Sequence, residues 1–181
     1  MRHERLVENI MDQIKEAQMK LGYAKESLRL YYPVATLNAM LGSSAENAQA
    51  MLELLQTDVF QNTVLGPLKF SARKQRIEIS VSSDGAEYVH TQMEEPAFLR
   101  ALIELFRQNH HCHLSDIEAL FSGFSTAYVC QKMPEGSDFD VVFYFEDAHI
   151  DKYCYCVKEE MGNTIYHRFT HEDMIELLKD E

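Results

Sequence analysis

The chain has 181 residues, of which 46% are hydrophobic and 25% charged, and its formal net charge is −12. A chain of this length and composition can bury a sizeable core, which excludes disorder of the whole molecule. The negative charge argues against nucleic-acid binding as the main function, because phosphate binding relies on clustered Lys and Arg. No apolar stretch approaches the roughly 20 residues needed to span a bilayer.

The N-terminus and the cysteines favour a reduced, cytoplasmic setting. The first five residues are mostly charged, whereas a secretory signal needs an apolar segment. Small secreted domains have a denser cysteine framework than this chain. We therefore expect reduced thiols at Cys112, Cys130, Cys154 and Cys156.

Helical periodicity dominates the first 60 residues or so. Apolar residues at three- and four-residue steps predict a helix over 6–21. Two more helices are expected over 24–31 and 33–41, and a capping box at 43–46 predicts a fourth. The expected stop signals are Gly22 and Gly42.

The period then changes to two residues, which is typical of strands. Apolar alternation predicts strands over 68–72 and 77–81, joined by a solvated basic tip at 73–76. Asp84-Gly85 is a two-residue hairpin signal, because both positions can take positive φ, so a third strand should follow over 86–90. This segment predicts an antiparallel meander.

Helices and strands alternate over the remaining chain. Helices are expected from Pro96, over 115–121 after a second capping box, and after Thr170, where Met174, Leu177 and Leu178 form the apolar face. Strands are expected over 128–133, 139–145, 153–157 and 165–169. The tight turns between strands favour antiparallel pairing.

These elements predict an α+β fold in one domain over 1–181. A helical section of about 1–60 would pack on a mainly antiparallel sheet with inserted helices over about 64–181, ending in a C-terminal helix. The acidity belongs to the last third, where residues 134–181 carry 13 Asp and Glu against 4 Lys and Arg. Such a surface can attract a basic partner or cations, or simply keep the protein soluble.

The first candidate site is the run His110, His111, Cys112 and His113. These residue types bind metals and carry protons, so the run is a candidate metal site, and the histidines beside Cys112 make that thiol a candidate nucleophile. Adjacent side chains on a short loop rarely converge on one ion, however. The alternative is a helix–helix connection in which histidines cap free carbonyls.

The second candidate is the pair Asp138 and Asp140 in Gly136-Ser137-Asp138-Phe139-Asp140. Two carboxylates at the start of an apolar strand can hold a divalent cation against a nucleotide phosphate. The stretch resembles the Ser-Asp-X-Asp strand of nucleotidyltransferases. That family also implies an upstream Gly-Ser helix start, which residues 122–125 do not match in order or spacing, and a third carboxylate, for which Asp151 or Glu159 could be proposed. The alternative is an acidic strand start that aids solubility.

Aromatic residues are dense in the last third, where they form either a binding face or the core and its rim. They are Phe139, Phe143, Tyr144, Phe145, Tyr153, Tyr155, Tyr166 and Phe169.

Three stretches carry a further resemblance: Gly22-Tyr23-Ala24-Lys25-Glu26-Ser27, Asp151-Lys152-Tyr153-Cys154-Tyr155-Cys156 and Ile165-Tyr166-His167-Arg168-Phe169-Thr170. They are similar to an uncharacterised bacterial family, domain-of-unknown-function family 3877, of short cytoplasmic proteins from anaerobic, gut-associated bacteria. The similarity spans nearly the whole chain. It implies no activity and no catalytic residue.

The sequence favours a non-catalytic binding protein over an enzyme, because caps, turns and core stripes are complete while no coherent catalytic constellation is present. The alternative is a divergent nucleotidyltransferase-like enzyme that uses Asp138 and Asp140 with a divalent cation. We expect no cofactor, and an unknown protein or small-molecule partner rather than nucleic acid or a membrane. A homodimer is compatible with this interpretation.

Overall fold

The computed structural model describes residues 2–109 and 111–177. Its contacts divide the chain into two compact units, 1–95 and 96–181, and each is described by itself. Both units combine helices with antiparallel strands, so the α+β prediction is confirmed. The prediction of one domain over the whole chain stays a prediction. Among the described residues, no helix is both long enough and apolar enough to cross a membrane.

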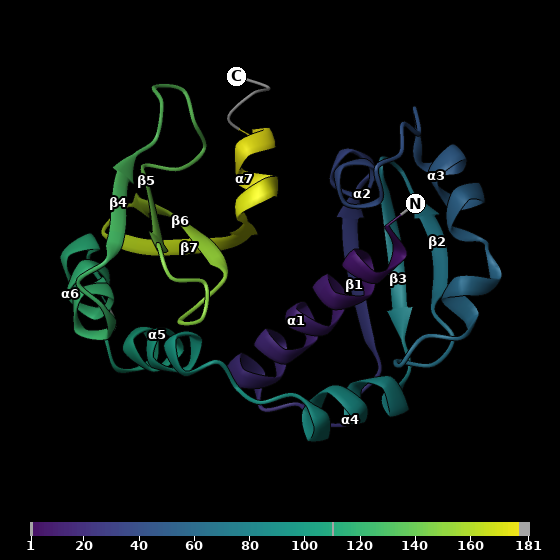
Figure 1. Cartoon of the computed structure of the whole chain (residues 1–181), viewed down its shortest axis with the longest axis horizontal. Helices are drawn as coiled ribbons and strands as arrows, with labels where there is room; N and C mark the ends of the chain where they lie inside the picture. The colour runs from purple at the N-terminus through teal and green to yellow at the C-terminus, as the bar shows by residue number, and fades with distance from the viewer. Residues whose placement is uncertain (1, 110, 178–181) are drawn as a thin grey trace. The chain divides into compact units, whose positions relative to one another are not determined.

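The first unit packs helices on one face of a small sheet (Figure 1). Its elements are α1 (His3–Leu21), β1 (Leu28–Pro33), α2 (Val34–Leu41), α3 (Ala48–Leu55), a 3-10 turn η1 (Asp58–Gln61), β2 (Lys69–Arg73), β3 (Arg76–Val81) and α4 (Ser83–Gln92). The three strands are antiparallel in the order β1-β3-β2. Buried apolar side chains of α1, α2 and α3 meet those of β3 in one core.

Strand β1 corrects the prediction that residues 24–31 are helical and that the first 60 residues contain no strand. Leu28, Leu30 and Tyr32 alternate with more exposed residues, and they pair with Val81, Ile79 and Ile77 of β3. That pairing partner lies about fifty residues away in the chain, so local periodicity did not reveal it. The predicted stop signals are confirmed, because Gly22 and Gly42 end α1 and α2 with φ of 74° and 63°.

The segment after β3 is a helix, so the predicted hairpin at Asp84-Gly85 and strand over 86–90 are wrong. The Ser82 hydroxyl caps α4 by accepting the Gly85 N–H at 3.2 Å. Ala86 and Val89 face inward at a three-residue step. Glycine is present for space rather than for a turn, because a Cβ at Gly85 would meet the carbonyl oxygen of Leu65.

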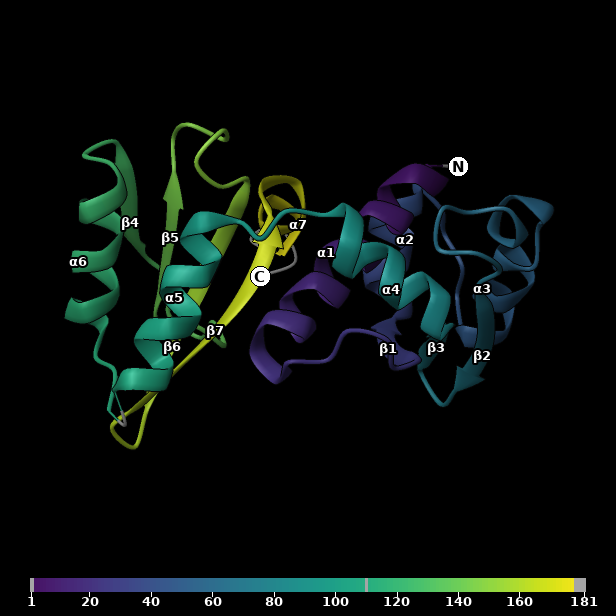
Figure 2. The same ribbon diagram turned by 90° about the horizontal axis from the view of Figure 1, so that it is seen from below.

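Helix α4 lies beside α1, and polar contacts join them (Figure 2). The Gln18 amide donates to the Ala86 carbonyl at 2.8 Å, and the Lys15 ammonium donates to the His90 carbonyl at 3.3 Å. The apolar stripe of α1 therefore ends earlier than its period predicts, and Leu21 is 61% exposed.

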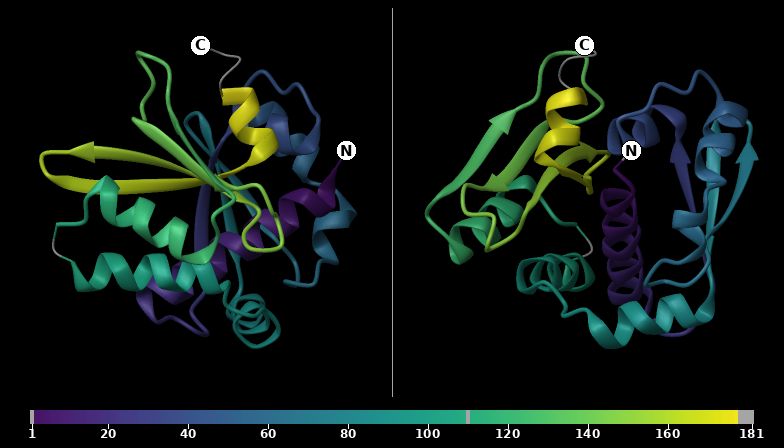
Figure 3. Two further views of the ribbon diagram at one scale, coloured as in Figure 1. Left: turned by 60° about the vertical axis from the view of Figure 1, so that its left-hand side comes forward. Right: turned by 45° about the vertical axis from the view of Figure 1, so that its right-hand side comes forward.

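The second unit is a four-stranded antiparallel sheet in the order β4-β5-β6-β7. Its elements are α5 (Ala97–Gln108), α6 (Leu114–Phe124), β4 (Tyr128–Lys132), β5 (Val141–Phe145), β6 (Tyr153–Glu160), β7 (Asn163–Thr170) and α7 (His171–Leu177). The left view of Figure 3 shows α5 and α6 on one face of this sheet and α7 on the other. Phe98 of α5 and Phe121 of α6 both pack edge-on against Tyr155 of β6.

The predicted faces of β6 are confirmed, since Tyr155 contacts α5 and α6 while Cys154 and Cys156 pack with Met174 of α7. Two details are corrected. Phe139 precedes β5 and packs in the α7-side cluster instead of extending the strand face. The predicted caps at 43–46 and 115–118 are displaced, because Asn47 and His113 are the residues that precede the helices. Leu178 lies outside the described residues.

Candidate functional site

The described side chains of the His/Cys run, from His111 to His113, do not converge on one point. His110 lies outside the described residues. His111 and His113 are exposed while Cys112 is buried, so these side chains diverge. Over 2–109 and 111–177, no three His, Cys, Asp or Glu side chains are close enough together to hold an ion.

Two residues of the run have structural contacts. The backbone N–H of His113 donates to the Asp116 carboxylate at 2.9 Å, which fixes the start of α6. The carbonyl of Cys112 accepts a hydrogen bond from the Thr164 hydroxyl of β7. Burial and the nearby Asp116 raise the pKa of the Cys112 thiol to about 11, which opposes formation of the nucleophilic thiolate.

Asp138 and Asp140 are exposed in the loop that precedes β5. The Asp140 carboxylate accepts a hydrogen bond from the backbone N–H of Glu159 at 2.8 Å. The backbone N–H of Asp140 donates to the Val157 carbonyl at 2.9 Å. These bonds extend the β5–β6 pairing by one step beyond the strand. Asp140 therefore has a structural contact of its own.

The two acids proposed as a third ligand have other side-chain contacts. The buried Asp151 carboxylate accepts the Tyr153 N–H and the Tyr155 hydroxyl, both at 2.8 Å. Glu159 lies 3.8 Å from the His113 imidazole. Neither acid forms a three-ligand cluster with Asp138 and Asp140 among the described residues.

The aromatic side chains of the last third belong mainly to the core. Phe143, Phe145 and Tyr155 are buried together under α5 and α6. Burial raises the pKa of the Tyr155 hydroxyl well above its ordinary value, so this hydroxyl stays protonated as the donor to Asp151.

The basic segment 73–76 is a hairpin tip, as the sequence predicts. Lys74 and Gln75 form the two-residue turn, and Lys74 has a φ of +56°. The Arg73 guanidinium lies 3.3 Å from the Glu78 carboxylate, so part of the positive charge is compensated within the hairpin.

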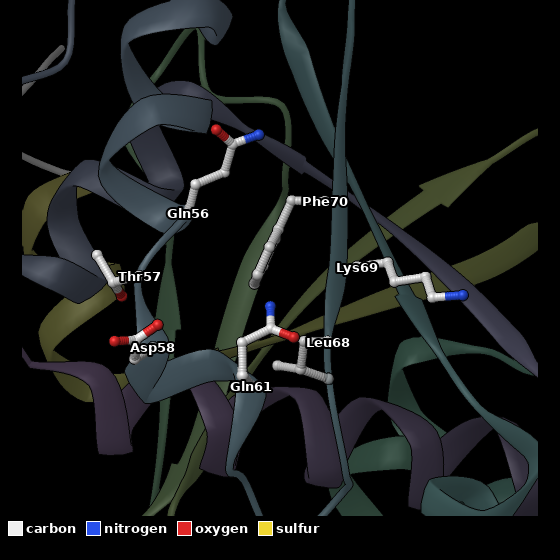
Figure 4. Close-up of a pocket in the computed structure, with 7 residues that line it drawn as sticks. All are labelled: Gln56, Thr57, Asp58, Gln61, Leu68, Lys69 and Phe70. Atoms are coloured by element: carbon white, nitrogen blue, oxygen red, sulfur yellow. The ribbon is translucent and has the colours of Figure 1, made fainter.

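A pocket opens in the first unit between the end of α3, η1 and strand β2. Its volume is about 330 Å³, which suits one side chain or a small ligand. The lining residues are Gln56, Thr57, Asp58, Gln61, Leu68, Lys69 and Phe70 (Figure 4). Phe70 also stacks edge-on against buried Phe60, with ring centroids 5.3 Å apart, which fixes the aromatic wall.

Several polar side chains of the pocket form no contact with other polar groups in the part of the chain that the structure describes. The side chains of Gln56, Asp58 and Gln61 have no hydrogen-bond or ionic partner among the described residues. The Thr57 hydroxyl oxygen is buried and likewise lacks a hydrogen-bond partner in that part of the chain. Gln56, Asp58 and Gln61 are exposed, so water solvates their polar groups, and a ligand that displaces this water can form hydrogen bonds with them.

Asp58 is the acidic residue that lines the pocket, and Lys69 is the basic one. The Asp58 carboxylate lies on the same side of β2 as the Phe70 ring, whereas the Lys69 side chain points away from the other labelled side chains (Figure 4). A carboxylate beside an aromatic face favours a cation, through Coulomb attraction and the ring quadrupole. The arrangement can therefore hold a positively charged group that has several N–H donors.

Sequence reasoning missed this pocket, because its residues come from two segments that pack together only in the fold. One local signal was present: Gln56, Thr57 and Asp58 interrupt the apolar pattern between a helix and a strand. Such breaks are usually plain connections, so the pattern alone could not separate a pocket wall from a loop.

Comparisons with other proteins identify the family and nothing finer. No curated protein and no solved structure matches the chain. One family model matches residues 3–178, so it spans both compact units. This agrees with the resemblance seen in the sequence, and the chain therefore belongs to the family described as "Domain of unknown function, E. rectale Gene description (DUF3877)".

Proposed function

We propose that the protein is a non-catalytic binding protein, and that the pocket between α3, η1 and β2 binds a positively charged, donor-rich group such as a guanidinium. The observation that carries the proposal is the unpartnered Asp58 carboxylate beside Phe70 and two free amide side chains. The acids considered for catalysis support the same interpretation, since Asp140 and Asp151 are engaged in main-chain or buried hydrogen bonds.

A titration with N-acetylarginine amide tests the pocket, followed by amide NMR shifts of the ¹⁵N-labelled protein. We expect the largest shifts at Gln56, Thr57 and Phe70 and at the Gln56 and Gln61 side chains. The neutral isostere N-acetylcitrulline amide should bind more weakly, because it lacks the charge that Asp58 attracts.

A matched pair of variants separates the pocket from the general acidity of the protein. Asp58→Asn should weaken arginine-amide binding by about fivefold, the upper range for a solvent-accessible ion pair. Glu53→Gln removes the same charge from α3 at a side chain that does not line the pocket, so it should bind like the wild type. Equal losses in both variants, or shifts centred on other residues, would overturn the proposed site.

We also propose a cytoplasmic location. All four cysteines are free thiols, and Cys154 and Cys156 lie side by side on one face of β6 without a disulfide. Free thiols suit a reducing compartment. Fractionation of cells that produce the protein tests this, and recovery with secreted or surface proteins would contradict it.

A further inference from the structure

We propose that the pocket is one part of a peptide-binding edge. In this arrangement, β2 accepts an extended peptide as an additional strand, with a basic side chain in the pocket and acidic side chains on either side of it. The inference rests on the proposed function, because the basic residue occupies the same pocket. It adds the identity of the partner and the way it binds.

The free edge of β2 follows from the sheet order, in which β2 is an end strand. The direction of its hydrogen bonds follows from the register. Arg73 pairs with Arg76 across the two-residue turn, so this pair is hydrogen-bonded, and bonded and non-bonded pairs then alternate. The Ser71–Glu78 pair is bonded, whereas Phe70 and Ala72 direct their main-chain groups away from β3.

Two independent contacts agree with this alternation. Pro33 of β1 pairs with Arg76, and a proline fits there because the Arg76 main-chain groups point to β2 instead. Leu68 is two residues before Phe70 and has the same orientation, and its N–H indeed leaves the sheet and donates to the Phe60 carbonyl at 2.9 Å.

The open part of the edge is therefore short and lies next to the pocket. The η1 segment closes it at Leu68, whose N–H donates to the Phe60 carbonyl. Beyond this point, the N–H and C=O groups of Phe70 and Ala72 have no partner among the described residues. A peptide that pairs with them gains main-chain hydrogen bonds and passes the mouth of the pocket, which is how strand addition combines affinity with side-chain selection.

The charges on β2 specify an alternating partner. A peptide side chain on the Phe70 side of the added strand meets Asp58, which selects a basic residue. Its sequence neighbours project to the opposite face. On that face the exposed Lys69 ammonium has no ion pair among the described residues, whereas Arg73, four residues further along, is already paired with Glu78. A basic residue with an acidic neighbour is therefore the complementary order, and acid–base–acid offers that neighbour to Lys69 in either strand direction.

The decisive experiment compares two peptides of one composition. The first, acetyl-Val-Thr-Glu-Arg-Glu-Thr-Val-amide, has the predicted alternation, and the second, acetyl-Val-Glu-Thr-Arg-Thr-Glu-Val-amide, places both acids on the same face as the arginine. Calorimetry should show roughly tenfold weaker binding for the second, because it cannot satisfy Asp58 and Lys69 together. Lys69→Glu should weaken the first peptide by about fivefold and leave arginine-amide binding unchanged.

Ala72→Pro tests the main-chain pairing. It removes an N–H that points away from β3, so the ladder within the sheet is retained while the peptide loses a donor. We expect at least a roughly tenfold loss of peptide binding, retention of arginine-amide binding, and a thermal midpoint close to that of the wild type. Ala72→Thr, which keeps the N–H, should bind the peptide normally.

The outcomes separate this inference from the proposed function. If the arginine amide binds and the alternating peptide binds no better, strand addition is wrong and the pocket stands. If neither ligand binds, both proposals are wrong. If sedimentation shows a dimer that Ala72→Pro dissociates, β2 pairs with a second copy and the peptide proposal is overturned.

Discussion

Gly85 illustrates how one residue can have two local explanations that only the packing separates. Asp84-Gly85 predicts a turn, but the structure places Gly85 in the first turn of α4, against the Leu65 carbonyl. A Cβ at this position would also lie 2.8 Å from the Val81 Cγ1 atom. Because a backbone carbonyl cannot rotate away as a side chain can, the close approach of the two segments requires glycine.

Gly85→Ala should therefore destabilise the protein by about 2 kcal/mol or more, through overpacking against Leu65. Gly123→Ala is the matched control, because Gly123 lies in α6 and no other part of the protein comes within 4 Å of the added Cβ. The control should be stabilising by about 0.5–1 kcal/mol, the helix preference of alanine over glycine. Urea unfolding measures both, and equal stabilities of the two variants would contradict the close-contact explanation.

At the scale of elements, Asp140 fixes the junction between β5 and β6. Asp140→Ala removes the acceptor of the Glu159 N–H and should lower the free energy of unfolding by about 0.5–1 kcal/mol. Asp138→Ala, two residues earlier in the same loop, should have almost no effect on stability. Magnesium-dependent nucleotide binding that both variants abolish would instead support the nucleotidyltransferase interpretation.

Elements with local signals were predicted well. Gly22 and Gly42 end their helices, and the 77–81 alternation is a strand, because caps and periodicity depend on near neighbours. Strand β1 and helix α4 were assigned wrongly because their conformations depend on distant partners, β3 for one and Leu65 for the other.

The candidate site was less predictable than the fold. The sequence pointed to chemically reactive residue types, and the structure buries Cys112 and engages Asp140 in the backbone. The pocket instead uses common polar residues, Gln56 and Asp58, whose position beside Phe70 arises only when α3 packs against β2. The type of a residue was therefore a weaker indicator of the candidate site than the way side chains from different segments come together in the fold.

At the scale of the whole molecule, buried ionisable groups predict loss of stability at alkaline pH. Burial raises the thiol pKa from 9.0 to about 12 for Cys154 and to about 11 for Cys156. The unfolded chain ionises these thiols first, so stability is complete below about pH 9 and falls as pH rises towards the folded-state values. Urea midpoints should be constant up to about pH 9 and should decrease between about pH 9 and pH 11.

Two cysteine variants test whether the buried thiols cause this loss of stability. Cys154→Ala removes a group with a large shift, so its urea midpoint should depend less steeply on pH. Cys130→Ala removes an exposed thiol, whose pKa burial raises less, and should leave the dependence closer to that of the wild type. Identical slopes for the Cys154→Ala variant and the wild type would show that other groups govern the alkaline transition.

Because of Pro33, the two edge strands of the small sheet, β1 and β2, differ in the main-chain donors that they expose. At the outer margin of β1, this residue presents a ring where another residue would present a donor, while β2 keeps its donors at Phe70 and Ala72. A sheet that can grow on both sides can polymerise, whereas one that grows on a single side stops after one addition. Pro33, which precedes α2, therefore removes one donor from the outer margin of β1 and shortens the edge along which another strand could pair.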